Sequence, residues 1–389
     1  MSEPDTSVPH DSRRQTGAGF LLDTPGAALE VHVPEDQREA AADAWQRHAP
    51  QLTDALGWDS TLTVRPFPSG LSLALSSPVD LLYTATEVNE AAWAAAHAEI
   101  TRQPVPDRES VLDRLRAEAA EEADPPLAAL LGDAERRGAP VVWDDDAVTV
   151  GLGASGRTYA PDALPSPAEI PWEEVGAVPT ALVTGTNGKS TTVRMLAGIG
   201  RAEGHTVGFS TTDAVTVGDE VVERGDFSGP LGARAVMRDG RVTFAVCEAA
   251  RGGRLRRGVP VPIVTASAFT NVAADHLGDY GVETVADLAE AKLVVAKALP
   301  AGGTLVAPAD EPAATDAALR QRETYLARGI RLAWTALDPS TDAPDGLAAS
   351  VVDGHVALRD GDGWRPVCAV DSIPAAMGGA APYAVRNAL

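Results

Sequence analysis

The sequence predicts an α/β protein whose carboxyl-terminal part is a doubly wound, mostly parallel sheet and whose amino-terminal part is a smaller α+β domain. Two observations predict the sheet. From Thr180 onward, short apolar runs alternate with amphipathic helical segments, and a glycine-rich turn follows the first run. A proline-rich linker at residues 161–177 separates the two parts. The 389 residues, 44% of them hydrophobic, suffice for two or three domains with their own cores.

The amino-terminal part is predicted to begin with a flexible polar tail over residues 1–19 and to continue as an α+β domain over residues 20–160. Alternating apolar positions favour strands, and apolar positions three and four apart favour helices. The predicted strands lie at 28–33, 62–66 and 71–76, with two short ones between 140 and 153, and the predicted helices lie at 35–56, 89–100 and within 108–137.

The carboxyl-terminal part, residues 178–389, is predicted to form the parallel sheet. Its predicted strands lie at 180–184, 207–210, 243–247, 262–266 and 304–307, and its predicted helices at 189–203 and 284–299. Residues 348–370 differ, because Asp-Gly pairs between short apolar runs predict antiparallel strands joined by tight turns. Doubly wound sheets bind ligands at the carboxyl ends of their strands, so we expect the functional site at that edge.

Composition and charge exclude several classes of protein. The net charge of −23 argues against nucleic acid as a partner, because phosphate backbones are bound mainly by concentrated Lys and Arg. No apolar run approaches the ~20 residues of a membrane helix, and residues 1–14 lack the pattern of a signal peptide. We therefore expect a cytoplasmic protein. Cys247 and Cys368 cannot form a disulfide framework or a zinc site, and both are expected to be buried, reduced and structural.

Lysine is scarce in this sequence. It occurs at Lys189, Lys292 and Lys297, so the other 29 of the 32 basic residues (32 minus 3) are arginines. A guanidinium stays charged, whereas an amine is a compact charge that can also lose its proton and react. Lysine is therefore expected where function requires it. Lys189 and Lys292 fall in the motifs described below, and Lys297 is expected at the surface.

A glycine-rich loop follows the predicted strand at 180–184. Glycines let backbone N–H groups turn toward phosphate oxygens, and the N-terminus of the following helix adds partial positive charge. Lys189 is suited to bridge the β and γ phosphates of ATP, and the Ser190 hydroxyl is suited to ligate Mg²⁺. The loop is shorter than the common form, and an ordinary glycine-rich turn is the alternative. The candidate nucleotide-binding residues are Gly185, Thr186, Asn187, Gly188, Lys189, Ser190 and Thr191.

Five further segments, together with this loop, resemble the Mur ligase superfamily, and within it the ligase half of cyanophycin synthetases. The resemblance covers residues 178–389, and the motifs occur in the order of the family. The segments are Ser-Thr-Thr-Asp at 210–213 with Gly-Asp-Phe-Ser-Gly-Pro at 225–230, the Glu-Ala-Ala-Arg-Gly-Gly run that continues to 258, Thr-Asn-Val-Ala-Ala-Asp-His-Leu-Gly at 270–278, Lys292 on the next predicted helix, and Tyr-Ala-Val-Arg-Asn-Ala-Leu at 383–389.

The resemblance implies an ATP-dependent ligase that joins a carboxylate to an amine through an acyl phosphate. It implies that His276 ligates or neighbours a second Mg²⁺, that Lys292 is carbamylated and supports magnesium, and that Asn387 meets adenine. The chemistry of the residues agrees at Glu248, because Mg²⁺ prefers hard oxygen ligands and Glu248 follows a predicted strand. The candidate catalytic residues are Lys189, Glu248, His276 and Lys292, and the candidate metal ligands are Ser190, Glu248, His276 and Lys292.

Several of these assignments have a plainer alternative. An isolated Asp-His pair is often only loop structure, and a lysine on the apolar face of a helix often extends its amine to solvent. Arg251, Arg254, Arg256 and Arg257 could bind an anionic substrate or cap a solvated loop. For the whole chain, one alternative is a catalytically silent nucleotide-binding module that regulates or scaffolds a ligase. Another, a mechanical P-loop ATPase, lacks a Walker B aspartate pair and an arginine finger that can be placed.

Two departures from the pattern of the family affect the expected activity. Residues 1–175 are too few to hold both an amino-terminal region and the ATP-grasp module of cyanophycin synthetases. The chain also stops at Leu389, where Mur ligases continue into a Rossmann-like domain. We therefore expect a fragment, a truncated form or a two-domain relative. The expected partners are a small-molecule or peptide-like carboxylate and an amine, with no membrane and with a homo-oligomer as one open arrangement.

Overall fold

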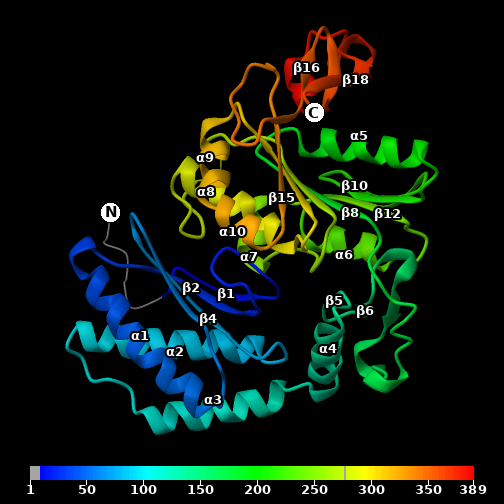
Figure 1. Ribbon diagram of the computed structural model, residues 1–389. Coiled ribbons are helices and arrows are strands. Elements are labelled where there is room, and N and C mark those ends of the chain that lie inside the picture. Colours follow the sequence, from blue (N-terminus) through cyan, green and yellow to red (C-terminus); the bar gives the residue numbers. More distant parts are fainter. Residues whose placement is uncertain (1–8, 276) are drawn as a thin grey trace.

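The structure, a computed structural model, describes residues 9–275 and 277–389 (Figure 1). Its amino-terminal part is a four-stranded antiparallel sheet in the order β1-β2-β4-β3, and helices pack on that sheet. Trp45 and Trp93 are fully buried in the core. The Trp45 indole donates a hydrogen bond to the Asn89 side chain at 3.0 Å. The strands are β1 (Asp11–Gln15), β2 (Gly26–His32), β3 (Leu62–Phe67) and β4 (Gly70–Ser76), and the helices are α1 (Arg38–Ala55), α2 (Leu82–Ile100) and α3 (Arg108–Glu122).

Strand β1 corrects the predicted tail over residues 1–19, because residues 11–15 pair with β2. The buried positions of β1 are Arg13 and Gln15, so the strand has no apolar alternation to reveal it. The Arg13 guanidinium forms an ion pair with the Glu30 carboxylate, and both side chains are at most 5% exposed. Arg13 Nε also donates to the Leu255 carbonyl at 3.0 Å, which ties this strand to the carboxyl-terminal part.

Breaking this buried ion pair should destabilise the protein. Glu30→Ala leaves a buried guanidinium without its main partner, and the expected loss is about 3–5 kcal/mol of unfolding free energy. Asp11→Ala is the matched control, since Asp11 binds the same guanidinium at 2.5 Å but is 31% exposed, and its expected loss is below about 1 kcal/mol. Urea unfolding followed by circular dichroism measures both. Equal losses in the two variants would contradict this account.

A small three-stranded antiparallel sheet joins the two parts of the chain. The proline-rich stretch after it is packed rather than extended in solvent. Ile170 is buried, and the Trp172 indole donates to the Pro167 carbonyl at 2.8 Å. The elements of this region are helix α4 (Pro125–Arg137) and strands β5 (Val141–Trp143), β6 (Val148–Val150) and β7 (Arg157–Tyr159).

The carboxyl-terminal part contains an 11-stranded sheet in the order β11-β10-β9-β12-β8-β13-β14-β15-β16-β17-β18. Strands β9 to β16 within this order are parallel, so the predicted α/β class and mostly parallel sheet are confirmed. The strands are β8 (Thr180–Thr184), β9 (Val207–Ser210), β10 (Ala214–Val217), β11 (Glu220–Arg224), β12 (Phe244–Glu248), β13 (Ala266–Phe269), β14 (Thr304–Pro308), β15 (Arg331–Thr335), β16 (Leu347–Val352), β17 (His355–Asp360) and β18 (Gly363–Ala369).

Helices cover both faces of this sheet. Helix α5 lies on one face and helix α6 on the other (Figure 1). Adjacent residues of β8 accordingly enter different cores, since Leu182 belongs to the core that contains Val236 and Val183 to the one that contains Val193. The helices are α5 (Lys189–Ala202), α6 (Pro230–Arg238), α7 (Arg251–Arg257), α8 (Val285–Leu293), α9 (Pro312–Arg320), α10 (Arg322–Ala327) and α11 (Pro382–Arg386).

The predicted strand at 262–266 was placed too early, because β13 begins at Ala266. Pro260 and Pro262 explain the shift, since proline has no N–H to give to a strand ladder. The antiparallel strands predicted from the Asp-Gly turns are present as β16, β17 and β18. Cys247 is buried as expected, but Cys368 on β18 is only partly buried.

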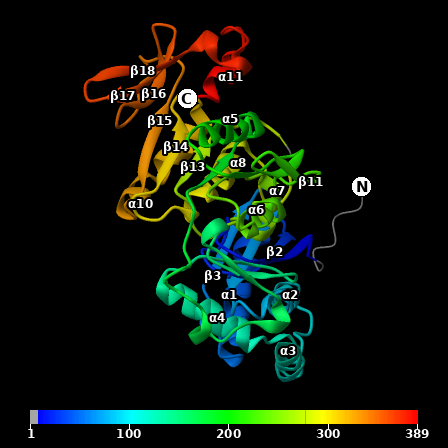
Figure 2. The ribbon, with the colours of Figure 1, turned by 90° about the vertical axis from the view of Figure 1, so that its right-hand side faces the viewer.

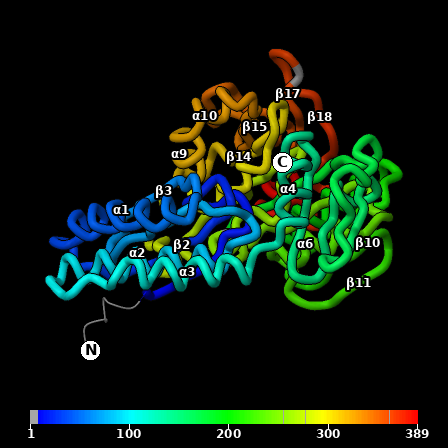
Figure 3. The backbone as a smooth tube through the Cα atoms, turned by 90° about the horizontal axis from the view of Figure 1, so that it is seen from below, coloured from blue at the N-terminus to red at the C-terminus, as the bar shows by residue number. Residues whose placement is uncertain are grey.

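The amino-terminal part sits below the large sheet, and the β16–β18 extension lies at the opposite end of the molecule (Figure 2). Seen from below, helices α1, α2 and α3 run alongside one another (Figure 3); α1 and α2 pack on the amino-terminal sheet, and α3 packs against α2. Arg65 of β3 forms an ion pair with Asp287 of α8 at 2.5 Å and donates to the Gly281 carbonyl at 2.7 Å. The described part of the chain contains no helix that is both long and apolar enough to cross a membrane.

Candidate active site

The predicted phosphate loop lies between the end of β8 and the start of α5, where the sequence placed it. Gly185 and Gly188 have φ angles of 152° and 83°, which side chains other than glycine rarely adopt. A side chain at Gly185 would also overlap the Thr270 hydroxyl. Both glycines are therefore required by the shape of the loop.

Asparagine 271, after β13, holds the loop from the neighbouring strand. The Asn271 Oδ1 atom accepts a hydrogen bond from the Asn187 N–H at 2.9 Å, and its Nδ2 donates to the Asn187 carbonyl at 3.0 Å. The Asn271 backbone carbonyl accepts from the Thr186 N–H at 2.9 Å. These bonds hold the backbone of Thr186 and Asn187 in place without a bound ligand.

A buried carboxylate faces the loop from β12, the strand next to β8. Glu248 is the last residue of β12 and is fully buried. Its Oε2 accepts a hydrogen bond from the Ser190 hydroxyl at 2.6 Å, and its Oε1 lies 3.7 Å from Lys189 Nζ. Thr212 follows β9 and approaches the same hydroxyl at 3.4 Å. Adjacent parallel strands end at one edge, which brings these groups together.

The Oε1 atom of Glu248 is buried and accepts no hydrogen bond from any described residue. Burying a carboxylate oxygen without a hydrogen-bond partner costs about 1–3 kcal/mol or more, so a bound ligand that contacts this atom would explain its burial. A divalent cation with oxygen preference fits the donors present, namely a carboxylate and two hydroxyls. Among the described residues there is no group of three or more His, Cys, Asp or Glu side chains placed to hold a metal.

A cavity of about 510 Å³ extends from the loop across the carboxyl edge of the sheet. Lys189, Glu248 and Lys292 all line it, so the structure brings three of the four predicted catalytic residues together. Lys292 lies on α8 and is 4% exposed, unlike a lysine that reaches solvent. The fourth, His276, lies outside the described residues. Thr186, Arg251 and Asp275 line the same cavity.

Asn387 lies beside the phosphate loop at the end of α11. Its side chain occupies the space that a side chain at Gly188 would need, and its carbonyl accepts a hydrogen bond from the Thr192 hydroxyl at 3.3 Å. Arg386 anchors this short helix through ion pairs with Asp310, at 3.1 Å, and Glu311. A five-residue helix is not stable alone, so these pairs position Asn387.

The arginines predicted as a cluster on α7 do not all lie in one site. Arg251 lines the cavity and forms an ion pair with Asp279 at 2.7 Å, whereas Arg257, at the other end of α7, donates to the Arg14 carbonyl. Lys297 was expected at the surface but forms an ion pair with Asp23 at 2.6 Å and donates to the Gly19 carbonyl. It therefore links the segment after β1 to the carboxyl-terminal part.

Sequence reasoning did not single out Asn271, Thr212 or Arg386 as site residues. All three fall inside the motifs described above, which was the available signal, but their contacts depend on strand order and on pairing between distant segments. Cys247, beside Glu248, is not a nucleophile, because burial raises the pKa of its thiol to about 12.

Comparisons with known proteins agree with this geometry. Residues 183–330 match the family described as the Mur ligase middle domain. The cyanophycin synthetase of Trichormus variabilis is 36% identical over 228 residues, which are 57% of this chain and 24% of that protein. That of a Synechocystis species is 37% identical over 218 residues, 54% of this chain and 24% of that protein. The chain thus spans about a quarter of the length of these relatives.

Two further matches are more distant. The UDP-N-acetylmuramate–L-alanine ligase of Kineococcus radiotolerans is 34% identical over 181 residues, which are 45% of this chain and 33% of that protein. The solved structure of a UDP-N-acetylmuramoyl-L-alanyl-D-glutamate–2,6-diaminopimelate ligase aligns with 49% of this chain and 39% of its own, at 19% identity and a TM-score of 0.35.

Proposed function

We propose, from the premise that residues 183–330 are a Mur ligase middle domain homologous to that of cyanophycin synthetases, that this chain carries the ATP site of a carboxylate–amine ligase. The single observation that carries the proposal is the buried Oε1 of Glu248, which accepts no hydrogen bond from a described residue and lies beside Lys189 and Ser190. A buried anion next to a phosphate loop is suited to hold a cation that ATP brings with it.

Different residues of the cavity are suited to bind the phosphates, the metal ion and the acid substrate. Backbone N–H groups of residues 185 and 188–190 and the amine of Lys189 would bind the phosphates, and Asn387 would border the nucleotide. Ser190 and Glu248 would hold Mg²⁺, with Lys292 as a further candidate. When bound, Mg²⁺ neutralises charge on the phosphate oxygens during transfer. Arg251, across the cavity, suits a carboxylate substrate.

The proposed reaction has two steps. A carboxylate oxygen of the acid attacks the γ-phosphorus of ATP, the bond to the bridging oxygen breaks, and ADP leaves. An amine nitrogen then attacks the carbonyl carbon of the acyl phosphate, inorganic phosphate leaves with the carbon–oxygen bond, and the nitrogen loses a proton. Neither step needs a side-chain nucleophile. The role of the protein is positioning and charge neutralisation, and the substrates are a small-molecule or peptide-like acid and an amine.

A screen for acid-dependent ADP release tests this proposal. The chain is incubated with ATP, Mg²⁺ and hydroxylamine, and amino acids and short acidic peptides are added in turn. Hydroxylamine attacks an acyl phosphate, so a competent acid should give ADP and a hydroxamate in equal amounts. ATP binding without acid-dependent ADP release in the whole panel would contradict the proposal and favour a silent nucleotide-binding module.

Lys292→Arg should strongly lower acid-dependent turnover, because an arginine cannot be carbamylated to supply a ligand oxygen. We expect a loss of about 100-fold, typical of a group that supports a metal ligand set. Lys297→Arg is the matched control, since the Asp23 ion pair requires only a positive charge there. Full turnover in Lys292→Arg, together with no carbamate signal after exchange with ¹³C-bicarbonate, would exclude the carbamate.

A further inference from the structure

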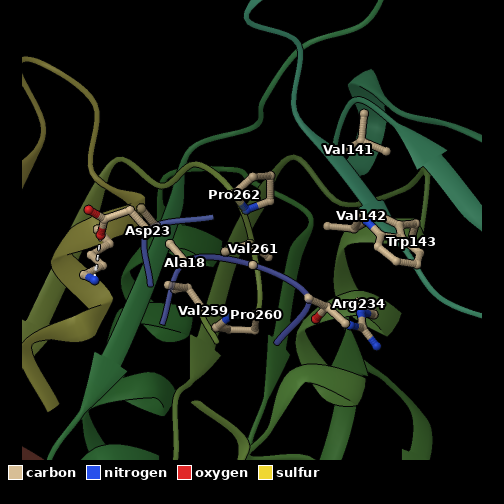
Figure 4. Close-up of a pocket in the computed structure, with 14 residues that line it drawn as sticks. Ala18, Asp23, Val141, Val142, Trp143, Arg234, Val259, Pro260, Val261 and Pro262 are labelled. Atoms are coloured by element: carbon tan, nitrogen blue, oxygen red, sulfur yellow. Dashed lines mark ion pairs between the residues drawn. The ribbon is translucent and has the colours of Figure 1, made fainter. Parts of the chain in front are cut away.

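A second cavity, of about 280 Å³, lies away from the phosphate loop (Figure 4). Its walls come from the segment after β1, from β5, and from residues 259–262, which lead into β13. Those residues precede the amino end of β13, whereas the phosphate loop follows the carboxyl end of β8. The cavity therefore lies toward the amino ends of the parallel strands, whereas the candidate active site lies at their carboxyl ends.

Arg234 of α6 lines this cavity and is the unusual group in it. Its side chain is 14% exposed, and its guanidinium makes no hydrogen bond to any described residue. The nearest carboxylate, that of Asp144, lies 3.6 Å away and is hydrogen-bonded instead to Arg238 at 2.7 Å. A largely desolvated cation with five unused donors is costly unless something else accepts from them.

Charges of both signs act on Arg234: those of Asp144 and Asp145, and those of Arg238 and Arg14. Burial is the largest effect on the pKa of the Arg234 guanidinium and lowers it; the charges of Asp144 and Asp145 act against this shift, and those of Arg238 and Arg14 add to it. Burial and the charge of Arg14 likewise lower the pKa of Arg257. Within residues 9–275 and 277–389, neither Arg14 nor Arg257 pairs with a carboxylate; Arg14 stacks 3.7 Å over the Tyr83 ring instead. Arg14 and Arg257 are therefore cations near Arg234 whose charges no described carboxylate neutralises by pairing.

The remaining walls indicate the kind of anion. Trp143, Pro260 and Pro262 contribute apolar surface to the same lining as Arg234 (Figure 4). The volume is close to the lower limit of small-molecule sites, about 300 Å³, and exceeds the needs of a single inorganic ion. Lys297 also lines the cavity, but its charge is neutralised by the ion pair with Asp23.

We propose that this cavity is a binding site for a small organic dicarboxylate, held by Arg234 through a bidentate ion pair. One carboxylate accepts from the unused donors of Arg234, a geometry that guanidinium groups match well. The carbon body lies against Trp143 and the prolines, and the second carboxylate lies in the field of Arg14 and Arg257. The site is separate from the ATP cavity and does not depend on the function proposed for it.

Calorimetric titration with succinate tests the site. The wild-type chain should bind succinate, and Arg234→Gln should weaken that binding by at least about tenfold, since a charge-assisted bidentate contact is lost. Arg251→Gln is the matched control, because it removes a guanidinium from the ATP cavity instead, and its affinity should equal that of the wild type. Unchanged affinity in Arg234→Gln, loss in Arg251→Gln alone, or no binding by the wild type would overturn the proposal.

Hydrogen–deuterium exchange on the wild-type chain gives a readout that does not depend on any variant folding. Succinate should slow exchange at residues 16–18, 141–143 and 259–262, which line the cavity. Slower exchange confined to residues 185–191 or 251–253 would place the ligand in the ATP cavity and contradict the proposal.

Discussion

Lys189→Ala is expected to lower ATP turnover by about 100- to 1,000-fold while the protein remains folded. Lys189 is the cation at the mouth of the loop, where its Nζ donates to the Thr186 carbonyl at 2.9 Å and lies 3.7 Å from Glu248. The other lysine of this cavity, Lys292, sits on α8, and an arginine is too bulky to replace a compact ammonium between phosphates. The developing charge on the γ-phosphoryl group would lose its partner.

Steady-state ADP release, with a thermal unfolding curve for each variant, measures this effect. Arg365→Ala is a charge-matched control, since Arg365 is exposed on β18 far from the loop, and it should keep wild-type turnover. Turnover of Lys189→Ala within a few-fold of the wild type would remove Lys189 from the proposed mechanism.

Glu248→Gln is expected to lower Mg²⁺-dependent turnover by about 100-fold without lowering the unfolding temperature of the magnesium-free protein. Glutamine keeps the shape of the side chain and removes its charge. The wild-type protein keeps a fully buried carboxylate with one oxygen that accepts no hydrogen bond from a described residue, which costs stability when no metal ion is bound. Replacing a group that costs stability but supports function should lower turnover while the unfolding temperature stays the same or rises.

The matched control for Glu248→Gln is Glu203→Gln, an exposed glutamate at the far end of α5, which should change neither quantity. Turnover and nucleotide affinity are compared over a magnesium titration. If Glu248→Gln lowered nucleotide affinity equally with and without magnesium, Glu248 would act through the loop and not through the metal.

The phosphate loop could be predicted because its signal is local: a strand, two glycines, Lys189 and a helix follow each other within a short stretch. The position of Glu248 could also be predicted, since it ends a strand and the carboxyl ends of parallel strands share an edge. Both predictions needed the order of elements along the chain but no knowledge of their packing.

Other features depend on contacts between distant segments. Strand β1 was missed because its inward positions carry Arg13 and Gln15, and their partners, such as Glu30, are visible only once the sheet has formed. The bond between Asn271 and the loop spans 84 residues, and the anchoring of α11 by Arg386 spans 75. No periodic pattern encodes such pairs, so the sequence alone could not assign these roles.

Transfer of ¹⁸O from the acid to phosphate is the most direct test of the central claim. An acid that stimulates ADP release is labelled with ¹⁸O in its carboxylate and incubated with the chain, ATP, Mg²⁺ and an amine. If the carboxylate attacks the γ-phosphorus, one labelled oxygen must leave with each inorganic phosphate formed, and mass spectrometry should find one ¹⁸O per phosphate. Phosphate that carries no label from the acid would show that water is the attacking group, and the chain would then be an ATPase and not a ligase.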